Sequence, residues 1–180
     1  AASDVYKRQT LGYVFNTEAP NIDEAAQRSE APLELVTRLA GEKARLTAQR
    51  NPSAIVIGAD QVAVVGTSVL GKPLTVPRAI DQLRRLSGQR VDFLSAICVI
   101  EPLGTTHSHV EKTKVSFRDL EIEAIEQYVA LDQPLDCAGG FRSEGLGVHL
   151  IERVESADPS AIFGLPLIAL SKILRTVGID

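Results

Sequence analysis

The stretch of sequence that decides the fold is residues 54–73, which read Ala54-Ile-Val-Ile-Gly-Ala-Asp60-Gln61-Val-Ala-Val-Val-Gly-Thr-Ser-Val-Leu-Gly71-Lys72-Pro73. Residues 55–57 form a β-branched apolar run of the length of a buried strand, and Gly58 ends that run. We therefore expect the carboxylate of Asp60 just beyond the strand, at the edge of the sheet where α/β proteins bind ligands. A plain β-hairpin with a solvated Asp60 explains the same residues, because turns favour Asp.

The second half of this stretch adds a strand, a turn and a cation. Residues 62–65 predict a second short strand, and residues 66–68 predict the turn that follows it. Lys72 lies between Gly71 and Pro73, which hold it in a fixed turn. An acid, an amide and a base (Asp60, Gln61 and Lys72) therefore lie close together in the sequence.

Length and composition indicate one soluble globular domain. The chain has 180 residues, of which 44% are hydrophobic and 23% are charged. No apolar run approaches the ~18 residues needed to cross a bilayer, and no signal-peptide pattern opens the chain, so we expect no membrane partner. Cys98 and Cys137 lie far apart without metal-ligand spacing, which favours a reducing, cytoplasmic location. The formal charge of −4 argues against a nucleic-acid partner but is compatible with a small anionic substrate.

Hydrophobic periodicity predicts alternating helices and strands along the rest of the chain. We expect helices over residues 31–49, 76–86, 121–131 and 165–177. We expect strands over residues 11–15, 91–100, 107–117 and 148–154. The order of these elements predicts an α/β fold with a mixed sheet flanked by helices, in one domain or two small lobes.

Several charged residues are candidates for a site. Asp60 is the best of them, because a carboxylate flanked by strands can bind a divalent metal or take a proton from water. Glu24 and Glu30 offer a second carboxylate, although acids ahead of a helix are usually caps and dipole partners. Lys43 and Lys72 can neutralise phosphate charge, although a lysine on a helix face is usually solvated. The glycines of residues 139–147 either line a pocket or form tight turns.

Taken together, these pieces resemble the Maf-like nucleotide pyrophosphatases. The resemblance covers the chain from about residue 11 to its end and rests on short motifs in the same order as in the family. These motifs are Pro-x-x-Asp-Glu at 20–24, Leu-Ala-x-x-Lys-Ala at 39–44, Ile-Gly-Ala-Asp-Gln-Val at 57–62, Gly-Lys-Pro at 71–73, Leu-Ser-Gly at 86–88, Val-x-Phe-Arg at 115–118, Ala-Gly-Gly-Phe at 138–141 and Gly-Leu-Pro-Leu at 164–167. The resemblance implies a single domain with two lobes around a cleft and a mixed, twisted sheet.

Within this family, the chain looks like the branch that acts on 7-methyl-GTP. The features that match are Gln61 directly after the acid, Phe-Arg-Ser-Glu-Gly at 141–145, and Asp-Pro at 158–159 ahead of the last motif. The branch that hydrolyses dTTP and UTP usually has Thr after the acid and Gln near the position of Glu144. A carboxylate at Glu144 can accept hydrogen bonds from the N1–H and amine of a guanine-type base. The dTTP and UTP specificity is the alternative.

The resemblance also implies roles for the candidate residues. Asp60 acts as general base on water that attacks the α-phosphorus, and Lys43 and Lys72 stabilise charge on the phosphates. Glu24 and Asp60 hold a divalent cation, Mg²⁺ or Mn²⁺. Gln61, together with the glutamate of the glycine-rich segment, sets base specificity, and the protein is a possible homodimer.

The amino terminus departs from the family pattern. The family opens with a strand and a Ser-x-Ser-Pro-x-Arg-Arg loop that cradles phosphate, whereas residues 1–9 contain neither Ser-Pro nor paired Arg. We therefore expect residues 1–9 to be non-native or replaced and the Maf-like domain to span residues 10–180. For the same reason we expect weak or no activity from this chain.

Two other function classes stay open at this point. The first is a non-catalytic regulator of cell division that binds a nucleotide in the same pocket, and the second is a structural domain without a ligand. A binding protein has no need of a general base, so the combination of Asp60 with two lysines favours the enzyme.

Overall fold

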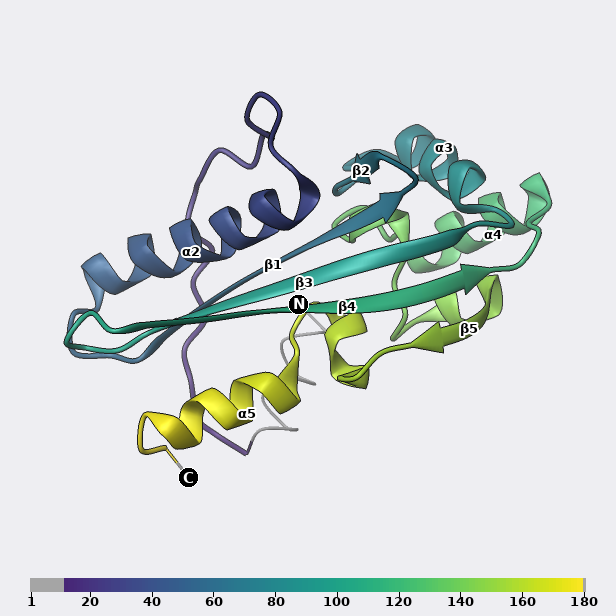
Figure 1. Cartoon of the computed structure of the whole chain (residues 1–180). Coiled ribbons are helices and arrows are strands. Elements are labelled where there is room, and N and C mark those ends of the chain that lie inside the picture. Colours follow the sequence, from purple (N-terminus) through teal and green to yellow (C-terminus); the bar gives the residue numbers. More distant parts are fainter. Residues whose placement is uncertain (1–11, 180) are drawn as a thin grey trace.

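A twisted five-stranded sheet forms the centre of the fold, and the computed structural model describes it within residues 12–179 (Figure 1). The strand order is β2-β1-β3-β4-β5, and each neighbouring pair runs antiparallel. The strands are β1 (Val56–Val65), β2 (Ser68–Leu70), β3 (Arg90–Ile100), β4 (Thr106–Phe117) and β5 (Ile151–Glu155). The α/β class is therefore confirmed, but the expected mixture of strand directions is not seen in the described residues, where every neighbouring pair of strands is antiparallel. Short turns reverse the chain between β1 and β2 and between β3 and β4.

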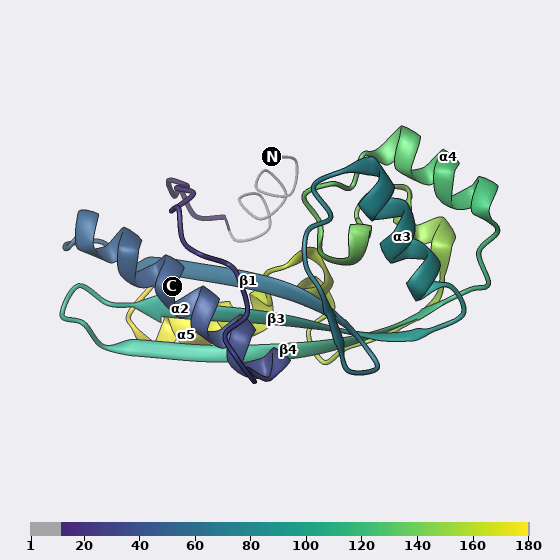
Figure 2. The same ribbon diagram turned by 90° about the horizontal axis from the view of Figure 1, so that it is seen from above.

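Helices cover the sheet in two groups, one at each end of the long strands (Figure 2). At one end α2 and α5 lie on opposite faces of the sheet, and α3 and α4 lie at the other end. The helices are α2 (Pro32–Arg50), α3 (Val76–Leu86), α4 (Ile122–Asp132) and α5 (Leu167–Thr176), with the 3-10 turns η1 (Ala138–Gly140), η2 (Leu146–Leu150) and η3 (Pro159–Phe163). This arrangement confirms the two lobes. None of the described helices is long and apolar enough to cross a membrane.

Alternation along β3 explains how one sheet supports two helical layers. Ala96 and Cys98 pack in the hydrophobic cluster of α2, and Ile97 and Val99 pack in the cluster of α5. Successive side chains of a strand point to opposite faces, so a strand buried on both faces reads as a continuous apolar run. This is the run that predicted a strand over residues 91–100.

The structure corrects the boundaries around Asp60. Residues 55–57 and 62–65 were expected as two strands with the acid between them, but β1 is one continuous strand in which Asp60 pairs with Ala96. The ladder with β3 continues on both sides of Gly58, from Val56 opposite Ile100 to Val64 opposite Asp92. Asp60 therefore lies in the middle of a strand rather than at its end, because an uninterrupted partner strand outweighs the local breaker.

Other predicted elements are shifted or absent. Residues 12–15 form no strand, and Gly12 there has a positive φ of 70° that takes the chain out of extended geometry. Residues 148–150 belong to a 3-10 turn rather than to the strand expected from residue 148, because the chain at Gly147 packs tightly against the carbonyl of Arg142. The last helix begins at Leu167, two residues later than expected. The expectations for residues 1–9, and for Leu11 as the start of a strand, lie outside the described residues.

Candidate active site

The site begins where α2 packs directly against β1 at Gly58. A Cβ atom placed on Gly58 lies 2.3 Å from the carbonyl oxygen of Ala40 and 2.6 Å from the amide nitrogen of Ala44. Only a residue without a side chain permits this backbone-to-backbone approach. The close approach brings Lys43, the neighbour of Ala44 on α2, within reach of the side chain two residues further along the strand.

That side chain is Asp60, which forms a partly buried ion pair with Lys43. Lys43 Nζ lies 2.5 Å from Asp60 Oδ1, and the two side chains are 16% and 9% exposed. Burial raises the pKa of the Asp60 carboxyl above its usual value, although the Lys43 ammonium opposes this shift. Burial alone lowers the pKa of Lys43, but the hydrogen bonds and charges of Asp60 and Glu24 outweigh it and raise that pKa. Lys43 is therefore a fixed cation beside a carboxylate that binds protons more readily than an ordinary Asp.

Glu24 joins the two candidate lysines into one cluster. Lys43 Nζ lies 2.7 Å from Glu24 Oε1, and Lys72 Nζ lies 3.6 Å from Glu24 Oε2. Burial raises the pKa of Glu24, but the hydrogen bond and charge of Lys43, with those of Lys72, lower it overall. Glu24, Asp60 and Lys72 line a pocket of about 210 Å³ together with apolar side chains of α2 and the sheet. The four residues proposed from widely separated motifs are thus brought together.

Gln61 also borders this pocket, but its side chain serves another contact. Its amide nitrogen donates to Ser95 Oγ at 2.9 Å and lies 3.1 and 3.2 Å from the carbonyl oxygens of Ala161 and Ile162. Ser95 is fully buried and its hydroxyl donates to the same Ala161 carbonyl at 2.7 Å. The Gln61 amide therefore ties η3 to the central strands.

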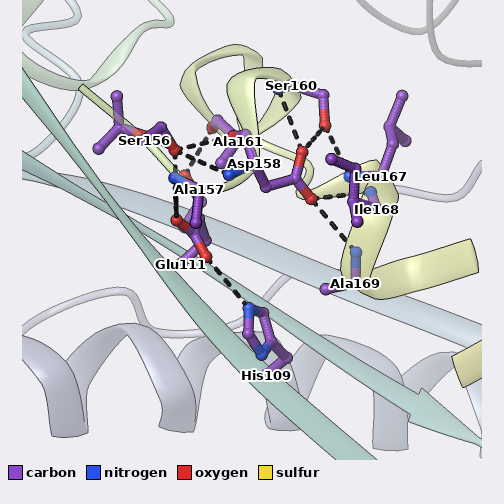
Figure 3. A network of polar contacts seen from close by, with 12 residues as sticks. His109, Glu111, Ser156, Ala157, Asp158, Ser160, Ala161, Leu167, Ile168 and Ala169 are labelled. Atoms are coloured by element: carbon purple, nitrogen blue, oxygen red, sulfur yellow. Dashed lines mark hydrogen bonds and ion pairs between the residues drawn. The ribbon is translucent and has the colours of Figure 1, made fainter. Parts of the chain in front are cut away.

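A buried carboxylate holds η3 in turn, as Figure 3 shows. Asp158 is 3% exposed and accepts hydrogen bonds from the hydroxyl of Ser160 and from the backbone amides of Ile168 and Ala169 in the first turn of α5. Glu111 supports the neighbouring turn through the Ser156 hydroxyl at 3.2 Å. This network orients the segment whose carbonyls the Gln61 amide contacts.

Glu144 lies outside this cluster. It is exposed in the turn between η1 and η2, and its carboxylate accepts from the hydroxyl of Ser143 at 3.4 Å. The glycine-rich segment nevertheless reaches the rim of the pocket, because the amide of Gly139 donates to the carbonyl of Gly71 at 3.1 Å. The structure thus places this segment beside the turn that carries Lys72, without placing Glu144 in contact with the charged cluster.

Glu30, the other acid considered for a second carboxylate, has a different partner. Its carboxylate accepts from Arg38 Nε at 2.6 Å and from Arg38 Nη2 at 2.9 Å. The hydrogen bond from Arg38 lowers the pKa of Glu30 to about 2. Sequence reasoning missed Arg38, because a separation of eight residues across a helix start matches no helical or strand spacing.

The donor set of the cluster suits a divalent cation that substrate helps to hold. Among the described residues, no group of three or more His, Cys, Asp or Glu side chains is placed to hold a metal ion alone. Glu24 and Asp60 supply two carboxylates, and Mg²⁺ typically binds through one or two carboxylates plus substrate phosphates. The residues therefore fit a cation that is bound together with a phosphorylated ligand.

Two lysines and two carboxylates thus form one ion-pair network, and three of its members line one pocket. The chain belongs to the family of Maf-like proteins, whose family model matches residues 3–177. A relative from Nitrosococcus oceani named 7-methyl-GTP pyrophosphatase is 46% identical over 99% of this chain and 92% of its own length. Relatives of the same name from Alkalilimnicola ehrlichii and Pseudomonas putida are 48% and 43% identical over 99% of this chain and 92% and 95% of their own lengths.

Proposed function

We propose that this protein is a nucleoside triphosphate pyrophosphatase that hydrolyses 7-methyl-GTP to 7-methyl-GMP and pyrophosphate, a hydrolase acting on acid anhydrides. The observation that carries the proposal is the ion-pair cluster of Lys43, Asp60, Glu24 and Lys72. Glu24, Asp60 and Lys72 of this cluster line one pocket. The names of relatives that align over nearly the whole chain support the substrate. Removal of a modified nucleotide from the cytoplasmic pool is the role that follows.

In the mechanism, Asp60 takes a proton from the water that attacks the α-phosphorus. Its raised pKa makes it a better proton acceptor than an ordinary Asp. Lys43 and Lys72 neutralise charge that develops on the phosphate oxygens, and the pyrophosphate leaves. Such a reaction needs positioning and charge neutralisation more than covalent chemistry, and residues fixed in one ion-pair network meet that need.

Glu24 and Asp60 would hold the divalent cation, Mg²⁺ or Mn²⁺. When bound, such a cation supplies positive charge that polarises the phosphate. The pairing of both carboxylates with Lys43 keeps them charged and oriented before the ligand arrives. EDTA is expected to abolish turnover, and added Mg²⁺ or Mn²⁺ to restore it.

A panel of nucleotides tests the substrate. Pyrophosphate release is measured with 7-methyl-GTP, GTP, dTTP, UTP and CTP in the presence of Mg²⁺ or Mn²⁺, for this chain and for one that carries the Ser-x-Ser-Pro-x-Arg-Arg amino terminus of the family. Selective release from 7-methyl-GTP supports the proposal, whereas selective release from dTTP and UTP supports the other branch of the family. Tight nucleotide binding by calorimetry without release from any of them supports a non-catalytic regulator instead.

Glu144→Gln is expected to weaken selection of the base. A carboxylate accepts from the N1–H and exocyclic amine of guanine, and it complements the positive charge of the 7-methylated ring. Loss of one charge-assisted hydrogen bond costs about 1.5–3 kcal/mol, so kcat/KM for 7-methyl-GTP should fall roughly tenfold or more. The ratio of kcat/KM values for 7-methyl-GTP and UTP measures this effect, and Glu126→Gln, which removes the same charge from an exposed position of α4, is the matched control. An unchanged ratio rules out base recognition by Glu144.

We also propose a homodimer. Its support is the edge of β4, where β5 pairs only with residues from Lys114 to Phe117, so residues 106–113 have one strand partner among the described residues. A second copy that adds its own β4 antiparallel, centred on Val110, places His109 opposite Glu111. Light scattering after gel filtration distinguishes a dimer from a monomer, and Val110→Lys is expected to favour the monomer.

A further inference from the structure

We propose that Arg38 is a positioning residue that holds Glu24 over the Lys43–Asp60 pair, and this inference rests on the proposed function. Among the described residues, Arg38 forms hydrogen bonds and ion pairs with Glu30, Glu42 and the backbone of Ala25, and not with Lys43 or Asp60. It therefore acts through the chain segment that carries Glu24.

The contacts of Arg38 fasten that segment to α2. Its guanidinium binds both carboxylate oxygens of Glu30, at 2.6 and 2.9 Å. Its Nη2 atom also donates to the carbonyl oxygen of Ala25 at 3.0 Å. Ala25 directly follows Glu24, so one side chain fixes the segment at both of its ends.

Besides the contacts of Arg38, the segment from Glu24 to Glu30 is attached by the ion pairs of Glu24 with Lys43 and Lys72. It forms no helix or strand, and Ser29 within it adopts a positive φ of 63°. Bonds within it or to its neighbours, such as the Gln27 amide to Glu30 at 2.9 Å, shape the turn without attaching it to the helix. The Glu30 side chain is 8% exposed, and removal of Arg38 leaves this half-buried carboxylate without its hydrogen-bonded cation, which is unfavourable.

Two side chains of α2 therefore have different roles. Lys43 touches the site directly, whereas Arg38 keeps Glu24 close to Lys43 and Lys72 at 2.7 and 3.6 Å. Without the contacts of Arg38 with Glu30 and Ala25, only the ion pairs of Glu24 itself hold it close to the lysines. These ion pairs are partly exposed and therefore weak. A substrate phosphate that binds these lysines then displaces Glu24 from its working position.

Arg38→Ala is expected to lower kcat on 7-methyl-GTP about 10- to 100-fold, the loss expected when a group near the reacting atoms is misplaced by about 1 Å. KM should change little, because both lysines remain. Arg38→Lys keeps one donor group, and its kcat should lie between those of the wild type and Arg38→Ala. Arg45→Ala, an exposed residue of the same helix, is the matched control and should match the wild type.

A double-mutant cycle with Glu24→Gln separates positioning from general destabilisation. If Arg38 acts through Glu24, Arg38→Ala causes no further loss of kcat in the Glu24→Gln background. Trypsin cleavage after Arg28, followed by mass spectrometry, measures how firmly this segment is held, independently of activity. Cleavage should accelerate in Arg38→Ala and Glu30→Gln but not in Arg45→Ala.

Two results overturn the inference: an Arg38→Ala enzyme with wild-type kcat, or a loss in the Glu24→Gln background as large as in the wild type. Inactivity on every nucleotide, both of this chain and of one that carries the Ser-x-Ser-Pro-x-Arg-Arg amino terminus, contradicts the proposed function instead. In that case the rate of trypsin cleavage after Arg28 in Arg38→Ala still tests whether Arg38 holds the segment from Glu24 to Glu30. Faster cleavage supports that role, and unchanged cleavage rejects it.

Discussion

Asp60→Asn is expected to lower kcat for pyrophosphate release by about 10²–10⁴-fold, the usual contribution of a general base. The amide keeps the shape of the side chain and an oxygen that can accept from Lys43, which lies 2.5 Å from Asp60 Oδ1. It cannot accept a proton from water. Nucleotide binding, measured by calorimetry, should be retained because Lys43 and Lys72 are still present.

The pH profile distinguishes loss of a base from loss of structure. Burial raises the pKa of Asp60, and only the unprotonated carboxylate can act as a base. kcat should therefore fall as the pH is lowered through that raised pKa, beginning at a higher pH than an ordinary Asp allows. The residual activity of Asp60→Asn should lack this acidic limb.

The same shift has a consequence for stability. Because the carboxyl of Asp60 binds a proton more readily in the folded than in the unfolded chain, its titration favours the folded state at low pH, and this contribution is lost as the pH rises through the raised pKa. Asp60→Asn removes that pH dependence of stability.

The kinetic result decides the role of Asp60. If Asp60→Asn keeps the wild-type kcat and the acidic limb of the pH profile, another group is the base.

Local sequence signals were sufficient for most helices and for the long strands. The helix expected over residues 31–49 is α2, Pro32–Arg50, because proline in the first turn and regular apolar spacing agree with the packing. The prediction that Glu24, Lys43, Asp60 and Lys72 belong to one site came from the motifs of the family resemblance. Spacing alone could not predict it, because these residues lie on a loop, a helix, a strand and a turn.

The errors came from effects that act between elements. Gly58 was interpreted as a strand breaker. Its role is instead to let the backbone of α2 pack closely against β1, at Ala40 and Ala44. The role of Gln61 in base recognition, which the resemblance implies, is not one of these errors and stays a prediction. The contacts of its amide with Ser95 and η3 were not predicted, because they join residues far apart in the sequence.

Gly58→Ala is expected to destabilise the fold and to reduce kcat together. The added methyl group would lie 2.3 and 2.6 Å from backbone atoms of Ala40 and Ala44, and neither atom belongs to a flexible side chain. The helix must therefore move away from β1, and overpacking of this kind typically costs about 1–3 kcal/mol. The same movement carries Lys43 away from Asp60, for which a loss of about 10²-fold in kcat is expected.

Urea unfolding and kcat on 7-methyl-GTP measure both effects, and Gly41→Ala on α2 is the matched control. The three atoms nearest to a Cβ at Gly41 all belong to the end of the Arg45 side chain, the first at 3.3 Å, and this side chain can rotate away. Gly41→Ala should therefore be neutral or stabilising by up to about 1 kcal/mol, since Ala favours helix over Gly, and should leave kcat unchanged. If Gly58→Ala loses stability but keeps kcat, the helix has moved without separating Lys43 from Asp60, and the contact at Gly58 supports the fold and not the site.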